Sequence, residues 1–502
     1  MRVPIALASG LVSDETTFST PGVYADGSNV RFWNGRPEVI GGWSSAFTDT
    51  LTGTCRGVRA WTDNSGIANI AFGTHSALMV YKAGELADIT PVGLAAGSID
   101  GAGGPGFGTG DYGEGLYGAN GASEWYARTW SLQNYGESLI ASPRGGTAYL
   151  WSNNVASVAT EITNAPDQIE CILVTPERQL LAFGCNEEVS TDYNGMCIRG
   201  SDIEDITNWT TATSNAFEHI LEGGGRIIAA RMLGAYVAVW TDTGVHLGQF
   251  IGQTGQAYRF DPVAQNCGAL GPNAVTVVNQ TAYWITPDLQ FYSWALGSPP
   301  APISCPIHRD FADNFVVSQS EKVFASAVTR FGEIWWHYPD ARDGIENSRF
   351  VAFSVFTGAW FRGAMERTAF IDSGPAEYPL GVDGDGAVYW HENGNSANGG
   401  AITWFIETSA QYLSEAQERV LVRGVWPDFE AQTGAISLTA YVREYPQGDA
   451  RTKGPWTLSP NRSKKDFLFQ GRVAALRFSG SSAPTFMRFG KPSFDIVNTG
   501  QK

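Results

Sequence analysis

Residues 323–361 read VFASAVTRFGEIWWHYPDARDGIENSRFVAFSVFTGAWF, and the fold class can be predicted from this stretch. Four apolar and aromatic runs follow one another in it, at 323–329, 332–338, 349–356 and 359–361. β-Branched and aromatic residues favour strands, and the Gly, Asp, Asn and Pro residues between the runs favour turns. The spacing therefore predicts an up-and-down antiparallel sheet of four strands.

The same pattern occurs just before this stretch, at 274–278, 281–286 and 289–294. Side chains alternate within 282–286, as they do in a strand whose sheet has two unlike faces. Four-stranded sheets repeated along a chain predict a β-propeller, in which each sheet, or blade, packs face to face on the next.

Comparable runs begin near Cys55 and end near His391, which gives about six or seven units of low mutual identity. The expected strands of these further units lie at 57–61, 67–73, 76–82, 129–132, 138–142, 147–151, 171–175, 179–184, 197–200, 227–233, 236–241, 244–250, 369–372, 378–383 and 387–391. We therefore predict an all-β fold with a β-propeller-like domain over residues 46–400.

A composition shift near residue 400 marks a second domain over residues 401–502. This segment has 13 Lys and Arg against 9 Asp and Glu, a balance of +4, which leaves −21 for the rest of a chain of net charge −17. Apolar residues alternate with polar ones over 436–443, which predicts a smaller β-sandwich or barrel. Residues 1–45 contain a hairpin with an Asn34-Gly35 turn, and we expect them to pack with this terminal domain, since chain ends often lie close together.

Composition excludes some classes of protein. The chain has 502 residues with 59 glycines and 43% hydrophobic residues, which suits an all-β protein rather than a disordered one. No apolar run approaches the ~20 residues of a membrane span. Residues 3–12 are expected to form a first strand, with a signal peptide as the alternative. The six cysteines are expected to be free thiols rather than a disulfide framework.

Residues 100–123 form a glycine-rich insertion within the propeller, with ten glycines between 101 and 121. The G-x-G spacing at Gly106 and Gly108 resembles a nucleotide loop, but no Lys-Ser/Thr and no helical pattern follow it. We expect either a flexible loop that lines or plugs an opening or a mere insertion.

The sequence contains no recognisable catalytic, cofactor-binding or metal-binding motif. The six histidines lie far apart, and no C-x-x-C or H-E-x-x-H occurs. His337 is expected to be a core or interface histidine. The protein is therefore predicted not to be an enzyme and to need no cofactor.

A propeller glycosidase is the sharpest enzymatic alternative, because such an enzyme needs two carboxylates around one pocket. The candidate carboxylates stand at strand ends or turns: Asp242, Asp288, Glu333 and Asp383. Trp125 and Tyr126 could stack on sugars, but packing between blades is the favoured explanation for them.

Several short motifs, spread in order along nearly the whole chain, carry a family resemblance. They are YADGSNVRFWNGRPEVIGGW at 24–43, CGALGP at 267–272, YWITPD at 283–288, QFYSW at 290–294, Cys305-Pro306, EKV at 321–323, GEIWWHY at 332–338, WFRG at 360–363, RTA at 367–369 and QERVLVRGVWPDFE at 417–430. They resemble tail proteins of short-tailed bacteriophages, of the tail nozzle or packaged-DNA-stabilisation (tail tubular) type.

The resemblance implies a structural virion protein without an active site, in the viral tail and assembled in the host cytoplasm. It implies a hexameric ring below the head-to-tail adaptor, which closes the DNA-ejection channel and contacts a tail fibre or tailspike. Phosphate binding needs Lys and Arg, so an acidic wall would let genomic DNA pass without specific binding. The alternative is a receptor- or carbohydrate-binding β-propeller of the tail.

Overall fold

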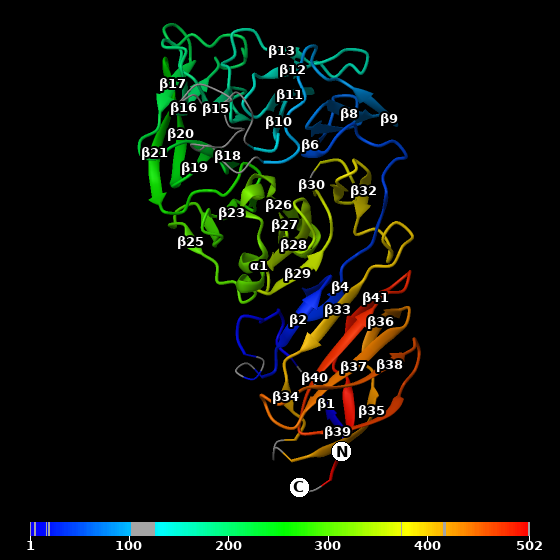
Figure 1. Cartoon of the computed structure of the whole chain (residues 1–502). Coiled ribbons are helices and arrows are strands. Elements are labelled where there is room, and N and C mark those ends of the chain that lie inside the picture. Colours follow the sequence, from blue (N-terminus) through cyan, green and yellow to red (C-terminus); the bar gives the residue numbers. More distant parts are fainter. Residues whose placement is uncertain are drawn as a thin grey trace, which may run out of the picture.

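The computed structural model describes residues 2–4, 7–16, 18, 21–101, 126–372, 374–414 and 418–499, within which strands form ten sheets (Figure 1). Residues 102–123 of the glycine-rich insertion lie outside the described residues. The expectation that this insertion lines or plugs an opening concerns those residues. Three short helical elements are described: α1 (His308–Asn314) and two 3-10 helices, η1 (Val317–Lys322) and η2 (Thr329–Phe331).

Seven four-stranded antiparallel sheets form the blades of a propeller, numbered here in chain order. Blade one consists of β6 (Cys55–Thr62), β7 (Ala68–Thr74), β8 (Leu78–Lys82) and β9 (Glu85–Asp88), and blade two of β10 (Trp130–Tyr135), β11 (Ser138–Pro143), β12 (Tyr149–Trp151) and β13 (Thr160–Glu161). Blade three consists of β14 (Cys171–Val174), β15 (Leu180–Asn186), β16 (Tyr193–Gly200) and β17 (Phe217–Ile220), and blade four of β18 (Ile227–Leu233), β19 (Tyr236–Thr241), β20 (Gly244–Gln253) and β21 (Gln256–Gln265). Blade five consists of β22 (Val275–Val278), β23 (Thr281–Ile285), β24 (Phe291–Ala295) and β25 (Ala301–Pro302), and blade six of β26 (Phe324–Val328), β27 (Glu333–Pro339), β28 (Asn347–Ser354) and β29 (Trp360–Ala364). Blade seven consists of β30 (Ala369–Ile371), β31 (Leu380–Val382), β32 (Val388–His391) and β5 (Trp43–Ser45).

The blades close into a ring. Each innermost strand (β6, β10, β14, β18, β22, β26, β30) contacts the innermost strand of the next blade, and β30 contacts β6. In the last blade, β5 from the N-terminal part of the chain pairs with β32. The seventh blade therefore joins two distant parts of the sequence, and this pairing holds the ring shut.

Blade six shows why the chain folds this way. All seven residues of β27 are buried, because the strand pairs with β26 and β28 and both of its faces are covered. Trp336 packs on Phe291 of blade five, with ring centroids 4.9 Å apart, while Trp335 packs on Phe370 of blade seven at 6.2 Å. Aromatic side chains thus alternate between the two neighbouring blades, as propeller packing requires.

The remaining three sheets form a terminal domain, built from residues 2–40 and 401–499 (Figure 1). Their strands are β1 (Arg2–Pro4), β2 (Tyr24–Ser28), β3 (Val30–Trp33), β4 (Arg36–Val39), β33 (Trp404–Thr408), β34 (Gln411–Tyr412), β35 (Val420–Trp426), β36 (Phe429–Thr433), β37 (Ile436–Arg443), β38 (Arg451–Leu458), β39 (Lys465–Gly471), β40 (Val473–Gly480), β41 (Phe486–Phe489) and β42 (Ser493–Asn498). Buried and partly exposed residues alternate along the whole of β37. The buried ones pack with apolar residues of β35 and β42 into one core.

The N-terminal strands are shared between the two domains. β1 pairs with β42, β2 with β33, and the β3–β4 hairpin joins β41. We expected the whole of residues 1–45 to pack with the terminal domain, but residues 43–45 form β5, which lies in blade seven. The expected first strand over 3–12 is also too long, because β1 ends at Pro4 and only Leu11 makes a further bridge, to Tyr24.

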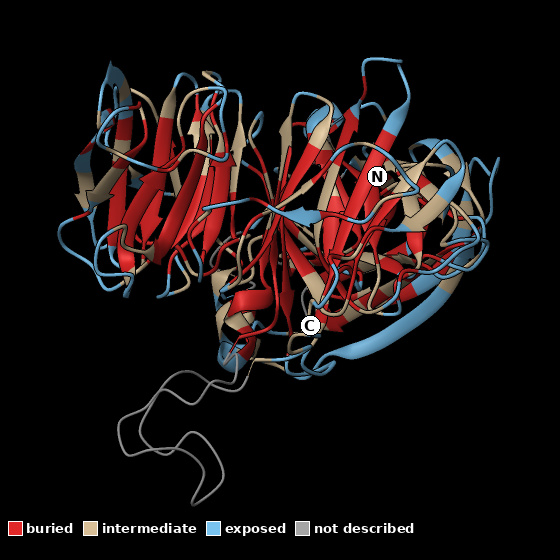
Figure 2. Cartoon of the chain, turned by 90° about the horizontal axis from the view of Figure 1, so that it is seen from above, coloured by how far each residue is buried: buried red, intermediate tan, exposed pale blue. Residues whose placement is uncertain are grey.

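The two domains share one apolar core, which runs from blades five and six into the terminal domain and includes Trp336, Trp360 and Phe478. Buried residues are concentrated in the strands, and exposed residues lie mostly in the loops around them (Figure 2). The all-β, propeller-like prediction is confirmed by the seven blades. The expected strands at 323–361 match β26 to β29 closely. Several outermost strands escaped prediction. β13 and β25 have only two residues each, and β21, although it has ten residues, is also absent from the expected strands.

Candidate functional site

The propeller axis has two unlike ends. The segments that lead into the innermost strands lie at one end, together with the turns between second and third strands; we call this end the entry face. The turns between first and second strands lie at the other end, the exit face. In propellers the loops around the axis are the usual place for a site.

Buried ion pairs fill the centre of the entry face. Arg144, from the turn after β11, donates to Glu170 at 2.7 Å and to Glu321 of η1 at 2.9 Å. Arg226, just before β18, donates to the other oxygen of Glu321 at 2.9 Å. Burial alone would raise the pKa of Glu321, but the two guanidinium groups lower it, so this carboxyl stays ionised. Blades two, three and four are thereby tied to the segment before blade six.

A second group of ion pairs, formed by the buried Lys322 and Arg56, lies beside the first. Lys322 of η1 contacts Asp100 at 2.5 Å and Glu346 at 3.5 Å, and Arg56 of β6 donates to both oxygens of Glu346 at 3.1 and 2.6 Å. Asn273, just before β22, donates to the Arg56 carbonyl at 3.1 Å, which links blades one and five across the axis. These contacts close the entry end of the axis with side chains, where an axial active site would need open space.

The candidate carboxylates of a glycosidase do not come together. Asp242, Asp288 and Asp383 lie in entry-face turns of three different blades. Asp242 accepts from the Gly225 amide at 3.0 Å, and Asp288 accepts from the Thr286 hydroxyl. Asp383 accepts from the amide of Ala387 at 2.8 Å and from the Tyr389 hydroxyl at 3.0 Å. Asp288 and Asp383 therefore each hold their own turn, and Asp242 holds the segment that leads into β18.

Glu333 lies at the exit face, against the terminal domain. Arg31 of β3 contacts Glu333 at 3.1 Å and donates to both oxygens of Glu392 at 2.7 Å, so it joins the terminal domain to blades six and seven. The indole of Trp335 also donates to Glu333, at 2.9 Å. Burial raises the pKa of Glu333 to about 7, against the opposing effect of Arg31. This geometry is that of a structural joint between domains.

The other candidate residues also have structural surroundings. Tyr126 is buried, and its ring lies 4.0 Å from the Arg144 guanidinium, so it does not face solvent for a sugar; Trp125 is outside the described residues. His337 is buried and stacks on Phe324, as expected for a core histidine. All six cysteines are free thiols. No group of His, Cys, Asp and Glu in the described part of the chain could hold a metal ion, and no described helix is long and apolar enough to cross a membrane.

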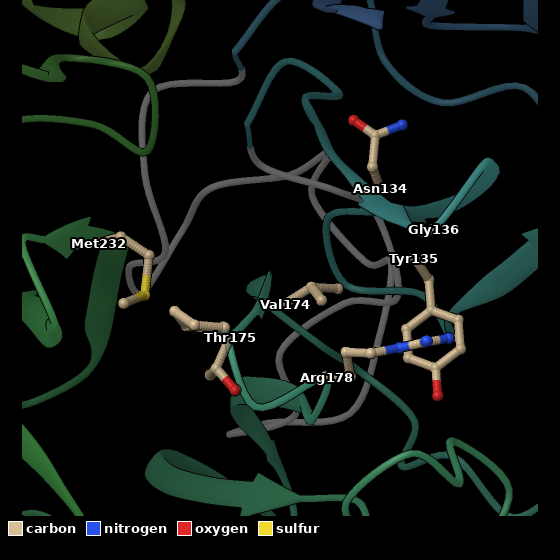
Figure 3. A pocket seen from close by; sticks show the side chains of 8 residues that line it. Asn134, Tyr135, Gly136, Val174, Thr175, Arg178 and Met232 are labelled. Atoms are coloured by element: carbon tan, nitrogen blue, oxygen red, sulfur yellow. The ribbon is translucent and has the colours of Figure 1, made fainter. Parts of the chain in front are cut away.

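The exit face is hollowed near the axis (Figure 3). The hollow has a volume of about 360 Å³, within the usual range of small-molecule sites. It is lined by the ends of the innermost strands of blades two, three and four, with Asn134, Tyr135, Gly136, Val174, Thr175, Pro176, Arg178 and Met232. No sequence pattern predicts this hollow, because its residues come from three blades and form no motif.

A basic edge lies at the far end of the terminal domain. Residues 451–465 read RTKGPWTLSPNRSKK, with five basic residues and no acidic one. They span β38, the edge strand of the six-stranded sheet, and Arg451, Lys453 and Arg462 are exposed. Lys and Pro on an edge strand discourage pairing with another strand, so this edge is suited to contacts through side-chain charge.

An acidic edge lies at the opposite end of the molecule (Figure 1). Glu85 and Asp88 on β9 and Glu161 on β13 are exposed on the outermost strands of blades one and two. Residues 43–400 carry 37 Asp and Glu against 17 Lys and Arg, a balance of −20, while the remaining residues carry +3. The molecule therefore has ends of opposite charge.

Comparisons with known proteins add little to this geometry. No protein-family model matches the chain, and no curated protein sequence matches it. The crystal structure of BamB from Moraxella catarrhalis is similar over 73% of this chain and 95% of its own, with 12% identity and a TM-score of 0.34. A likeness at that level carries no argument, and the fold rests on the sheets themselves.

Proposed function

We propose that this chain is a structural virion protein, the tail nozzle of a short-tailed bacteriophage. It forms the distal part of the DNA-ejection channel below the head-to-tail adaptor and retains the packaged DNA. The motifs along the sequence suggest this role. The observation that carries the proposal is the opposite charge of the two ends of the molecule.

Opposite charges at two ends favour contact between unlike surfaces of successive copies. Such a head-to-tail contact makes a ring when the rotation between copies closes, and a hexamer is the expected closure. The basic edge over 451–465 would meet the acidic edge formed by Glu85, Asp88 and Glu161 of the next copy. Complementary potentials of this kind direct association and select the partner.

The channel would lie between copies and not through any one propeller. The ion pairs around Glu321 and Glu346 fill the axis at the entry face, which leaves no path along it for a duplex. A ring whose subunits each carry a −20 propeller would present an acidic surface, which repels phosphate and lets DNA slide past. In this assembly the protein acts in the virion tail, against the adaptor on one side and a tail fibre or tailspike on the other, after assembly in the host cytoplasm.

Charge reversal at the basic edge tests the assembly. The variant carries Arg451→Glu, Lys453→Glu and Arg462→Glu on exposed side chains, so the fold should survive. The wild-type chain of 54.1 kDa is expected to run as a ring of about six copies by light scattering, and the variant as a monomer. Reversal of the exposed Arg259 on β21 is the matched control and should leave the ring intact.

A charge swap sharpens this test. Reversal of Glu85, Asp88 and Glu161 to Lys should also give monomers, and mixing the two reversed variants should restore association. High salt should weaken the wild-type ring, because exposed charges are screened. A wild-type chain that stays monomeric at every concentration, or a ring unaffected by both reversals, contradicts the proposal.

A receptor- or carbohydrate-binding propeller of the tail is the second candidate, and the exit-face hollow is the observation that favours it. Its volume suits a small ligand, and Tyr135 offers an aromatic ring at the rim. Binding of a host glycan by a monomer, lost on Tyr135→Ala, would support this function over the nozzle. A glycosidase is the weakest candidate, because its four proposed carboxylates are dispersed.

A further inference from the structure

The strand that closes the propeller ring packs on a buried histidine. β5 pairs with β32 so that Trp43 lies opposite His391, and the indole stacks on the imidazole with ring centroids 5.6 Å apart. His391 is 2% exposed, and Phe370 of β30 also contacts it, with ring centroids 5.0 Å apart. Departure of β5 would remove Trp43 and open the imidazole to water.

A buried arginine fixes the protonation state of this histidine. Arg367 Nε donates to His391 Nε2 at 2.8 Å. A guanidinium is a donor only, so the nitrogen that it reaches must carry a free lone pair, and the imidazole must be neutral. Gly381 of β31 allows this approach, because a Cβ there would lie 2.7 Å from His391 Nε2 and 3.0 Å from Arg367 Cδ. The packing of blade seven therefore requires a neutral His391.

No close carboxylate offsets the charge of Arg367. Among the described residues, none lies within ion-pair distance of this side chain, and the carboxyl groups of Glu366 and Asp383 act on it from further away. Its other close neighbours are neutral: the Glu366 carbonyl and the rings of Trp43 and Tyr389. A proton on His391 would place a second positive charge in this buried space, which is unfavourable.

Two titratable groups of blade six complete the surroundings. Burial, then the charges of Arg367 and His337, hold the pKa of His391 well below its ordinary 6.5. Burial and then Arg367 lower the pKa of His337 to about 3. Glu333 behaves in the opposite way, since burial raises its pKa to about 7, but it contacts Arg31 of β3 rather than β5.

These shifts determine how blade seven responds to acid. A group whose pKa is lowered in the closed structure takes up a proton more readily once the structure opens, so protons favour the open form. For His391 the stabilisation is complete above the ordinary pKa of 6.5 and is lost as the pH falls below it. Glu333 opposes this loss in the fold as a whole, although not at β5.

The same part of blade seven holds the terminal domain. Glu392 follows His391 directly in the chain and accepts from Arg31 of β3 through both oxygens at 2.7 Å. The Gly41 amide, between β4 and β5, donates to the same carboxylate at 3.2 Å. Loss of the pairing between β5 and β32 would therefore loosen both the ring and the joint between the two domains.

We propose that blade seven is an acid-sensitive latch, in which protonation of His391 at Nε2 breaks its hydrogen bond with Arg367 and releases β5 from β32. Histidine suits this task, because its charge changes between about pH 5 and pH 8, and protonation of buried histidines switches packed interfaces in proteins. The latch goes beyond the proposed nozzle function, since it concerns one subunit and works whether or not copies assemble.

Hydrogen exchange of the full-length chain, followed by mass spectrometry and corrected for the intrinsic effect of pH, tests the latch at pH 8 and pH 5. The peptide over residues 41–46 should lose protection about thirtyfold at pH 5, because the open form takes up a proton with the ordinary pKa of 6.5 and the closed form does not. A peptide over β15 in blade three should keep its protection. Unchanged protection of residues 41–46 would overturn the proposal, and so would an equal loss in both peptides, since the whole chain would then be unfolding.

Two variants assign the effect to the histidine and its partner. His391→Gln keeps an acceptor for Arg367 but takes up no proton, so residues 41–46 should be equally protected at both pH values. Arg367→Met removes the charge that opposes protonation and should make the loss of protection smaller than in the wild type. His219→Gln, at a half-buried histidine of blade three, is the control and should respond to acid as the wild type does. A full thirtyfold loss in both His391→Gln and Arg367→Met would contradict the latch.

Discussion

The two ends of the propeller axis use the same residue type in opposite ways. At the entry face, Arg56, Arg144 and Arg226 meet Glu346, Glu170 and Glu321 in buried pairs. Nearer the exit face, Arg59 donates to a neutral oxygen of Asn134, and Arg231, between the two ends, donates to the carbonyls of Ala230 and Pro272. The difference teaches that the entry face is held together by ion pairs between blades, while the arginines further along the axis are held by neutral oxygens.

This contrast bears on the proposed channel. A propeller that closes its own axis cannot serve singly as a conduit, so a conduit must arise between copies. The opposite charges of β38 and of the outer strands β9 and β13 provide the means to assemble them.

Arg144→Met should have the largest effect on stability. It leaves Glu170 and Glu321 buried with one guanidinium fewer, and breaking a buried ion pair in this way costs about 3–5 kcal/mol. Chemical denaturation at neutral pH measures the loss in the free energy of unfolding. Asp261→Asn removes an exposed ion pair and should change it by less than about 0.5 kcal/mol. If Arg144→Met lowered the free energy of unfolding as little as the control does, the ion pairs of the entry face would not stabilise the fold as proposed.

Glu333→Gln should change the pH dependence of stability by the next largest amount. Burial raises the pKa of Glu333 from its ordinary 4.5 to about 7, so the folded chain holds a proton that the unfolded chain releases. Wild-type stability should therefore fall as the pH rises from about 4.5 to about 7, by up to about 3 kcal/mol from this group.

The glutamine side chain of the variant cannot titrate, so the variant's free energy of unfolding should depend less on pH across that window. Between pH 5 and pH 8 the variant should therefore lose less stability than the wild type. Denaturation curves at several pH values measure both. An equal slope in the two proteins would show that Arg31 keeps Glu333 ionised throughout.

Arg231→Met should change the free energy of unfolding least, and the change should be opposite in sign to that of Arg144→Met. It removes a half-buried charge that has no carboxylate partner among the described residues, and two hydrogen bonds to carbonyls are lost with it. In chloride buffer we expect the free energy of unfolding to stay level or to rise by about 1 kcal/mol. A loss of the size expected for Arg144→Met would mean that the two ends do not differ.

Local patterns predicted most of the propeller. The strands at 323–361 follow from short aromatic and β-branched runs bounded by turn residues, which are properties of neighbours in the sequence. The pairing of β5 with β32 did not follow, because it joins residues more than 340 positions apart. Short outer strands such as β13 also lack the length over which alternation becomes visible.

Neither candidate site could be predicted in the same way. The pair of Arg56 and Glu346 is separated by 290 residues, and it forms only because the ring brings blades one and six together. Arg59 and Arg231 stand singly on strands, where a sequence pattern cannot separate an ion-paired side chain from one without a carboxylate partner. The charge difference between the domains could be predicted from the sequence, because the charges of a segment can be added up without knowledge of its contacts.

A three-dimensional image of the assembled wild-type chain tests the central claim most directly. The account predicts a closed ring of about six subunits, with its opening between copies and each propeller axis blocked at the entry face by the groups around Glu321. A lone monomer, or an assembly whose only opening runs through the propeller axis itself, would contradict it.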